Sequence, residues 1–439
     1  MHKLTFSYED TCLLDQEQFE MLSKQLVDAA HRARKQYEQQ YDTPYGFAYV
    51  PEDTEYQEHI KAVVDKKRSL EPAALFLIGI GGSSLGAKAI EDALRGVYAG
   101  ECMSDIAFYS VDTIDTDKTR QLLHIARSYL DAGRNIVVNI VSKSGTTTET
   151  LINGSVFIDL LQQKRPDRYK QWIVVTTDED SPLDTYAQEH GLDVLYVPQH
   201  VGGRYSVFTA VGMFPLGLLG IDTDGLRYGA RNATKACLDA TMDNSAMMSA
   251  IILYQHYARG RNIHDTFLFD ANLLEVGNWY RQLMGESIGK RKGSDSQVIR
   301  VGITPTVSIG TVDLHSVAQL YLAGPHDKFT TFVYIEDQEK DIAIPDVDLT
   351  REIPVEGKSI EDVKRAILRG VQRAYKNEKR PFVSVALEDK SAQALGEFLQ
   401  FKMFEMIYLA DLFGVNAFNQ PQVELYKSET RKILQEKKA

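Results

Sequence analysis

Along most of the chain, short apolar runs of strand length alternate with longer segments in which apolar residues recur at helical spacing. The run AALFLIGI (73–80) leads into the loop GGSSLG and then into AKAIEDALRGVY, which has helical periodicity. The same order recurs after NIVVNIV (135–141), after WIVVTT (172–177) and after LDVLYV (192–197). Alternating strands and helices predict a parallel sheet that is covered by helices on both faces.

A second series of strands and helices begins after residue 225. An amphipathic helix is predicted over SIEDVKRAILRGVQRAYK (359–376), between two strands. The strands of this series are predicted at TFLFD (266–270), FTTFVYIED (329–337) and FVSVALED (382–389). Two α/β domains fit these two series better than one long sheet does.

The predicted organisation therefore has three parts. Residues 1–60 form an N-terminal helical segment, which includes a helix over 13–38. Residues 61–225 form a first α/β domain, and residues 226–439 form a second one that closes with C-terminal helices and a lysine-rich tail. Each domain is expected to hold a mainly parallel sheet flanked by helices.

Composition limits the classes of partner. The chain has 439 residues, 44% of them apolar, which is enough for two full-sized cores. With 49 basic and 61 acidic residues the net charge is −12, which argues against a nucleic-acid or anionic-membrane partner. Any anionic ligand must then be held by local positive charge.

Three further absences in the sequence narrow its class. The N-terminal stretch lacks an apolar signal core, and no later run is apolar for long enough to span a membrane, so a cytoplasmic location is expected. Cys12, Cys102 and Cys237 are odd in number and far apart, which argues against a disulfide framework or a zinc site. The sequence has no cluster of His, Cys and Asp residues at the spacing of metal ligands, so it predicts no metal site.

The loop GIGGSSLG (79–86) approaches two nucleotide-binding motifs and matches neither. Ser84 stands where a dinucleotide fingerprint needs its third glycine, and Ala87 stands where a P-loop needs its lysine. Its small residues still allow a ligand to approach the backbone, and Ser83 and Ser84 offer hydroxyls ahead of a helix. An ordinary strand-to-helix turn is the alternative interpretation.

The stretch VSKSGTTTET (141–150) carries six hydroxyl side chains and one lysine directly after a predicted buried strand. Hydroxyls and free backbone N–H groups at the start of a helix suit an anion. One lysine suits a monophosphate better than a triphosphate, which would ask for more charge and a magnesium ligand. The alternative is a helix cap without a ligand, but a cap needs only one or two hydroxyls.

Five separated motifs together resemble the glucose-6-phosphate isomerase family, in its shorter bacterial form, over residues 45–430. They occur in the order and with roughly the spacing of that family: GIGGSSLG, SKSGTTTET, VGGRYS (201–206), GESIGK (285–290) and FNQPQVELYK (418–427). The resemblance implies two sugar-isomerase domains and a homodimer. It also implies the interconversion of glucose 6-phosphate and fructose 6-phosphate without a cofactor.

The resemblance also assigns the isomerisation step to two residues. Moving a carbonyl between C1 and C2 requires a base for a weakly acidic C–H proton and a group that stabilises the enediolate. Glu286 matches the base of the family, and Arg204 matches the arginine that faces the enediolate oxygens. Taken without the resemblance, Glu286 reads as a solvated glutamate and Arg204 as a surface arginine after a turn.

Ring opening and substrate binding are assigned in the same way. His315 and Lys427 match the ring-opening pair, and histidine suits this task because its pKa lies near neutrality. In the family this histidine comes from the partner subunit. The expected substrate-binding residues are Gly82, Ser83, Ser142, Lys143, Ser144, Thr147, Gln282 and Gln420.

The sequence departs from the family pattern at three places. Gln199 precedes VGGRYS where a small or acidic residue is usual, and Gln422 stands where Gly or Ala is usual. The segment 290–310 is longer than in the bacterial form. Two alternative functions stay open at this point: a non-catalytic sugar-phosphate sensor, and a related isomerase of mannose 6-phosphate or an amino sugar.

Overall fold

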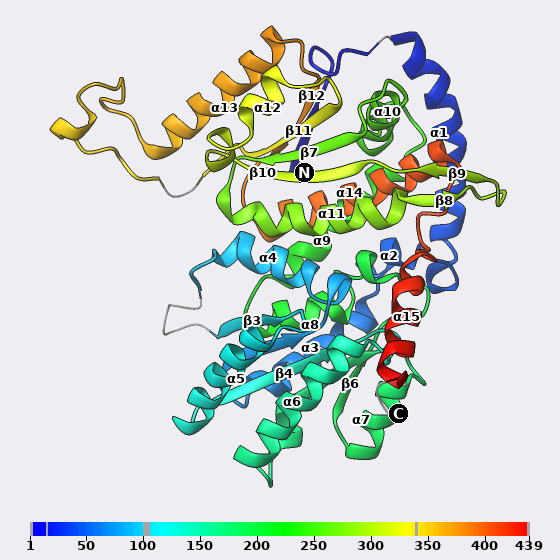
Figure 1. Cartoon of the computed structure of the whole chain (residues 1–439), viewed down its shortest axis with the longest axis vertical. Coiled ribbons are helices and arrows are strands. Elements are labelled where there is room, and N and C mark those ends of the chain that lie inside the picture. The colour runs from blue at the N-terminus through cyan, green and yellow to red at the C-terminus, as the bar shows by residue number, and fades with distance from the viewer. Residues whose placement is uncertain (1–2, 15, 100–105, 339–340, 437–439) are drawn as a thin grey trace.

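Two five-stranded sheets organise the computed structural model, which describes residues 3–14, 16–99, 106–338 and 341–436. In Figure 1 the sheets lie one above the other, with a layer of helices between them. This layer contains α4 (Leu85–Arg95), α9 (Thr223–Cys237), α11 (Leu274–Ile288) and α14 (Ala392–Phe413). The predicted fold class, α/β with mainly parallel sheets flanked by helices, is confirmed.

The first sheet is entirely parallel, with the strand order β3-β2-β4-β5-β6. Its strands are β2 (Pro72–Ile78), β3 (Ala107–Val111), β4 (Asn135–Val141), β5 (Ile173–Thr177) and β6 (Asp193–Tyr196). Within β2, Leu75 and Leu77 belong to one core, while Phe76 and Ile78 belong to a second. Both faces are therefore buried, which is why the strand reads as an unbroken apolar run.

Helices cover the two faces of this sheet. On one face, apolar residues of α5 (Thr116–Asp131), α6 (Thr148–Lys164) and α7 (Pro182–His190) share a core with the sheet. The other face packs against α3 (Thr54–Arg68), α4 and α8 (Ala210–Leu218). The loops that follow β2 and β4 consequently open at one edge, because the two parallel strands are neighbours.

The second sheet has the order β1-β12-β11-β7-β10 and is parallel except for β1. Its strands are β1 (Leu4–Ser7), β7 (Ile263–Leu268), β10 (Thr304–Ile309), β11 (Lys328–Ile335) and β12 (Phe382–Leu387). An aromatic core packs α12 (Ala318–Ala323) and α13 (Ile360–Asn377) on one face. The opposite face packs against α10 (Ser245–Ala258), α11 and α14.

The N-terminal residues depart from their predicted role. The helix predicted over 13–38 is α1 (Gln16–Tyr37), but residues 4–7 form β1 and pair with β12 at the edge of the second sheet. A four-residue edge strand leaves too short an alternation to be recognised in the sequence. The connector after α1 also includes the short helix α2 (Gly46–Tyr49), in which Phe47 is fully buried.

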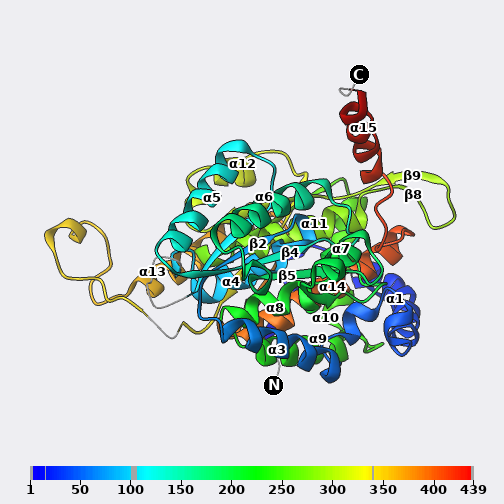
Figure 2. The same ribbon diagram turned by 90° about the horizontal axis from the view of Figure 1, so that it is seen from below.

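Three strands of the second predicted domain were not predicted. The segment 290–310 folds into a hairpin of β8 (Lys290–Lys292) and β9 (Val298–Val301), followed by β10. The lysine-rich tail expected after residue 430 begins within a helix, α15 (Val423–Glu436), which has no buried residue and projects from the body in Figure 2. The domain boundaries at 60 and 225 fall inside α3 and α9, so the proposed division stays a prediction.

Two glycines let α9 and α14 cross in close contact. A Cβ atom at Gly396 would lie 2.1 Å from the carbonyl oxygen of Leu226, and one at Gly229 would lie 1.9 Å from that of Gln393. Real Cβ atoms essentially never approach so closely, so both positions require glycine. This crossing lies in the layer of helices between the two sheets.

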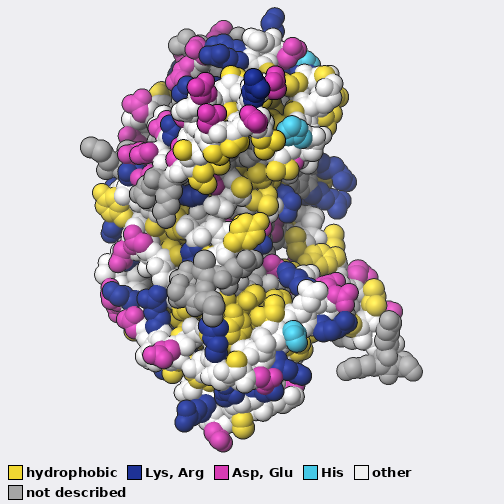
Figure 3. Space-filling model, turned by 90° about the vertical axis from the view of Figure 1, so that its left-hand side faces the viewer, with side chains coloured by type: hydrophobic (Ala, Val, Ile, Leu, Met, Phe, Trp, Pro, Cys, Tyr) yellow, Lys and Arg dark blue, Asp and Glu magenta, His cyan; other side chains and the backbone are white. Residues whose placement is uncertain are grey.

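The surface carries acidic and basic side chains interspersed, as Figure 3 shows for one face. Cys12 and Cys237 are buried free thiols, whereas Cys102 lies outside the described residues. Within the described part of the chain, no group of three or more His, Cys, Asp or Glu side chains could hold a metal ion. No helix described here has both the length and the apolar character that a membrane span requires.

Candidate active site

Glycines bring two loops of the first sheet into backbone contact. A Cβ atom at Gly82, in the loop after β2, would lie 2.3 Å from the carbonyl carbon and oxygen of Gly203 and 2.7 Å from the backbone nitrogen of Arg204. Gly81, with φ +58°, adopts a backbone conformation that favours glycine. The GIGGSSLG and VGGRYS motifs therefore meet, and their contact fixes the backbone that carries Arg204.

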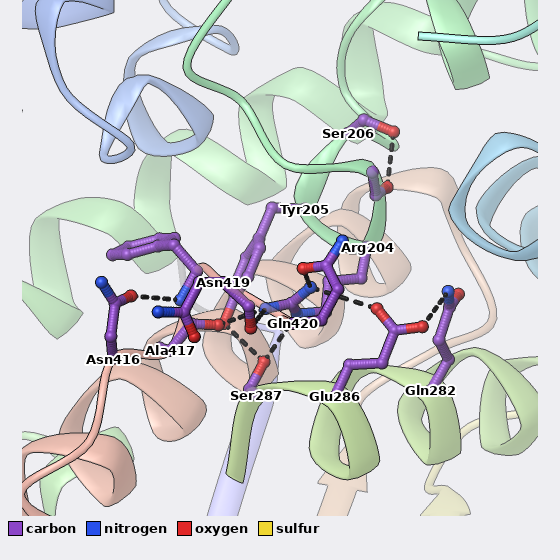
Figure 4. A network of polar contacts seen from close by, with 12 residues as sticks. Arg204, Tyr205, Ser206, Gln282, Glu286, Ser287, Asn416, Ala417, Asn419 and Gln420 are labelled. Carbon is purple, nitrogen blue, oxygen red and sulfur yellow. Dashed lines mark hydrogen bonds and ion pairs between the residues drawn. The ribbon is translucent and has the colours of Figure 1, made fainter. Parts of the chain in front are cut away.

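Arg204 is the centre of a polar network, although only 2% of its surface is exposed. Its Nε donates to Ser287 Oγ at 2.9 Å, and its Nη1 donates to Glu286 Oε2 at 3.1 Å and to Gln420 Oε1 at 2.8 Å (Figure 4). Its Nη2 donates to the backbone carbonyls of Ala417 and Asn419. One guanidinium thus gathers side chains and carbonyls from α11 and from the loop after α14, as its fixed fork of donors allows.

Glu286 presents an oriented carboxylate at the C-terminal end of α11. Its side chain is 31% exposed, so a ligand has access to it. While Oε2 accepts from Arg204, Oε1 accepts from Gln282 Nε2 at 3.1 Å, from one turn earlier in the same helix. Gln282 Oε1 is buried and has no hydrogen-bond partner among the described residues. A ligand hydroxyl donating to this oxygen would satisfy it.

Lys290 and Ser287 join the network, although no role was predicted for either. Lys290 Nζ donates to the backbone carbonyls of Glu286 and, at 2.6 Å, of Asn419. Burial, with Arg204 nearby, lowers the pKa of Lys290 to about 8. Ser287 Oγ also lies 2.8 Å from the hydroxyl of Tyr205. Both residues belong to the GESIGK motif, so the sequence could have indicated them. The backbone carbonyls that Lys290 contacts cannot be recognised from a sequence.

The hydroxyl-rich loop after β4 leads directly into α6. Ser142 Oγ donates to Thr147 Oγ1 at 2.9 Å, and Ser144 Oγ lies 3.1 Å from Thr146 Oγ1. Thr147 is the N-cap residue of α6, but its side chain makes no capping hydrogen bond to the first turn. The backbone N–H groups of Thr146 and Thr147 donate to Ser144 Oγ and Ser142 Oγ, so the hydroxyls of this loop bond to one another and to its own backbone.

Lys143 ties this loop to the segment that precedes VGGRYS. Its Nζ donates to the carbonyl of Gln199 and lies 3.9 Å from Asp178 Oδ2. Burial lowers the pKa of the Lys143 ammonium and raises the pKa of Asp178 to about 6. Gln199, one of the departures from the family pattern, contributes here through its backbone and not through its side chain. Ser83, by contrast, is half-buried in the loop after β2.

His315 and Lys427 lie apart from the Arg204 network within one chain. His315 is exposed directly after a short 3-10 helix at Val312–Leu314, near the carboxyl end of β10. Lys427 is exposed on α15, where its Nζ pairs with Glu424 Oε1 at 2.8 Å. Neither residue contributes to the described contacts of Arg204 and Glu286. Their predicted roles therefore stay predictions.

Comparison with solved structures defines the class of this fold. The chain superposes on a hypothetical protein from Thermus thermophilus with a TM-score of 0.87, 31% identity, and coverage of 98% of this chain and 99% of the other. A glucose-6-phosphate isomerase from Chlamydia trachomatis gives a TM-score of 0.82 at 21% identity, covering 99% of this chain and 89% of the other. The chain therefore has the same fold as this glucose-6-phosphate isomerase.

Sequence relatives narrow the class to one family. The chain is 34% identical to a glucose-6-phosphate isomerase of Thermus thermophilus over 391 residues, which cover 89% of this chain and 90% of the relative. It is 31% identical to the enzyme of that name from Methanocaldococcus jannaschii over 423 residues, covering 96% and 97%. Residues 23–439 match phosphoglucose isomerase. The chain belongs to the phosphoglucose isomerase family.

Proposed function

We propose that this protein interconverts glucose 6-phosphate and fructose 6-phosphate, in glycolysis and gluconeogenesis. The observation that carries the proposal is the Glu286 carboxylate, which is accessible and has each oxygen held by a different donor. Glu286 would remove the proton from C2 of the open-chain aldose and return it to C1, while the hydroxyl proton of O2 passes to O1, which gives the ketose. The carboxylate is then free again, so no cofactor is consumed.

Arg204 supports this step as the stabiliser of developing negative charge. Its guanidinium is buried and already directed at the oxygens of Glu286 and Gln420, so it would meet the enediolate without reorganising. Gln282 and Gln420 would position the sugar, and the unpartnered Oε1 of Gln282 suits a donating hydroxyl. Gly82 supports close approach of the backbone, because the loop around it leaves no room for a side chain.

We assign the phosphate of the substrate to the hydroxyl-rich loop after β4. Ser142, Ser144 and Thr147 would donate to its oxygens, and Lys143 would add a positive charge. Ser83 would contribute from the neighbouring loop after β2. The adjacency of β2 and β4 supports this assignment, since it directs both loops toward the same edge of the sheet.

Ring opening is assigned to His315 and Lys427. Because neither residue contacts the Arg204 network within one chain, we propose a homodimer in which His315 serves the site of the partner subunit. Lys427 would reach the site by movement of α15, which has no buried residue to hold it in place. Both assignments rest on the match to the family's motifs. A cytoplasmic location is part of the same proposal.

A coupled assay of fructose 6-phosphate conversion to glucose 6-phosphate tests the function. Turnover is expected in a buffer that contains a strong chelator, because Glu286 can carry out the proton transfer without a metal. Mannose 6-phosphate and an amino sugar phosphate serve as comparison substrates. Absence of turnover with fructose 6-phosphate, or activity that needs an added divalent metal, would contradict the proposal.

A further inference from the structure

A polar cavity lies beside the Arg204 network, between the β8–β9 hairpin and the loop after α14. Its volume is about 310 Å³, and three consecutive cationic residues of the hairpin line it: Lys290, Arg291 and Lys292. Arg291 and Lys292 are exposed and have no ion-pair partner among the described residues. In a chain of net charge −12, this is a local concentration of positive charge.

Neutral polar side chains complete the lining. Ser294 and Ser296 offer hydroxyls from the turn of the hairpin, and Asn416, Asn419 and Gln422 line the opposite wall. Hydroxyls, amides and a guanidinium can all donate hydrogen bonds to phosphate oxygens. The nearby carboxylate of Asp295 accepts a hydrogen bond from the backbone N–H of Gln297, and it reduces but does not cancel the positive charge.

Two departures from the family pattern meet in this cavity. The segment 290–310, which we expect to be longer than in the bacterial form, supplies the hairpin, and Gln422, at a position where we expect Gly or Ala, lines the cavity. These features are far apart in the sequence, and apart from Lys290 neither contributes to the Arg204 network. Their convergence indicates a property of this chain that the shared isomerisation does not require.

From this lining we infer that the cavity binds a small anion with more than one phosphate group. The number of cationic residues distinguishes this ligand from the substrate. The loop after β4 has the single cation Lys143, which suits one phosphate, whereas the cavity has three cationic residues. Arg291 would engage a phosphate through two parallel N–H donors, and Lys292 would act as a point charge. Lys290 connects the cavity to the active site, because it donates to the carbonyl of Glu286.

The test is a calorimetric titration of inorganic pyrophosphate into the full-length protein in metal-free buffer. The variant Arg291→Ser/Lys292→Ser removes two exposed cations and should weaken binding at least about tenfold, since each charge-assisted hydrogen bond is among the strong ones. Arg373→Ser/Lys376→Ser is the matched control. It removes one exposed arginine and one exposed lysine from α13, which Figures 1 and 2 show on the opposite side from the hairpin.

A third variant separates the cavity from the substrate site. Ser142→Ala/Thr147→Ala alters the loop assigned to the substrate phosphate and should leave pyrophosphate binding in the cavity unchanged. The proposal is overturned if the hairpin variant binds pyrophosphate as tightly as the α13 control does. It is also overturned if the Ser142/Thr147 variant loses as much affinity as the hairpin variant. Isomerase activity is measured separately, so failure of the proposed function would be seen independently.

Discussion

At the scale of single residues, Glu286 and Gln282 form the part of the proposed active site that lies at the end of a helix. The two residues lie one turn apart on α11, so one side chain can orient the other. Arg204 holds the second carboxylate oxygen from a separate loop. The carboxylate is therefore fixed from two directions and still accessible, which is the arrangement that a positioned base needs.

We expect Glu286→Gln to abolish isomerisation while sugar-phosphate binding stays nearly unchanged. Glutamine keeps the shape of the side chain and its contacts but is no base, so turnover should fall at least about 10²-fold. Exchange of the C2 hydrogen with solvent deuterium, followed by NMR, should stop as well. Anomer interconversion of the bound sugar should persist, because ring opening is assigned to His315 and Lys427. Turnover within tenfold of the parent would assign the base to another residue.

The hydroxyl loop yields a prediction about affinity. Ser142→Ala/Thr147→Ala should raise the KM for substrate and weaken inhibition by inorganic phosphate, because each hydrogen bond to a charged group contributes roughly 1.5–3 kcal/mol. Ser155→Ala is a suitable control, since this exposed hydroxyl on α6 donates only to the carbonyl of Ile152 among the described contacts. Unchanged affinity for both the substrate and inorganic phosphate would show that the loop acts only as a helix cap.

At the scale of elements, the crossing of α9 and α14 depends on the absence of side chains. Gly396 faces the carbonyl of Leu226, and the rigid backbone there cannot move aside as the end of a long side chain can. This crossing lies in the layer between the sheets, where α11 also packs against α14. Disturbing it would therefore disturb the support of the helix that carries Glu286.

Gly396→Ala should destabilise the fold by about 1–3 kcal/mol, the usual cost of overpacking, and lower the midpoint of thermal unfolding. Gly370→Ala in α13 is the matched control, because a Cβ atom there meets nothing within 4 Å. Alanine favours a helix more than glycine does, so the control should gain up to about 1 kcal/mol. Equal unfolding midpoints for the two variants would show that α9 and α14 adjust without cost.

At the scale of the whole molecule, His315 lies apart from the Arg204 network within one chain, so its proposed role requires a contribution from a second subunit. A homodimer provides this contribution if each subunit lends its His315 to the other. Two inactive variants can then restore activity together. In a mixed dimer of Glu286→Gln and His315→Ala, one site combines both substitutions and the other combines neither.

Mixing equal amounts of these two variants, followed by subunit exchange, should therefore restore roughly a quarter of the parent activity, since half of the dimers would be mixed and each would hold one intact site. The assay is again the conversion of fructose 6-phosphate. The activity of each variant taken alone through the same exchange procedure provides the baseline. If the mixture stays at this baseline although mixed dimers form, His315 acts in its own chain or not at all.

Sequence patterns were sufficient to predict those elements whose apolar and polar residues form a clear pattern within one segment. The strands β2 and β4, buried on both faces, read as unbroken apolar runs, and α13 reads as an amphipathic helix. Edge strand β1 and the hairpin β8–β9 were missed, because short strands with little burial leave a weak pattern. The motifs around Arg204 and Glu286 could be recognised because their residue types and spacing are local properties.

The sequence by itself thus determined the α/β class, the two series of strands and helices, and the candidate residues in their motifs. Only the tertiary structure decided which of those residues meet. It joined Arg204 to Glu286 and Gln420 across 82 and 216 positions and left His315 and Lys427 apart. It also added Lys290 and the backbone carbonyls around it. The physical reason is that periodicity records which face of an element is buried, whereas contacts between distant segments depend on how the elements pack.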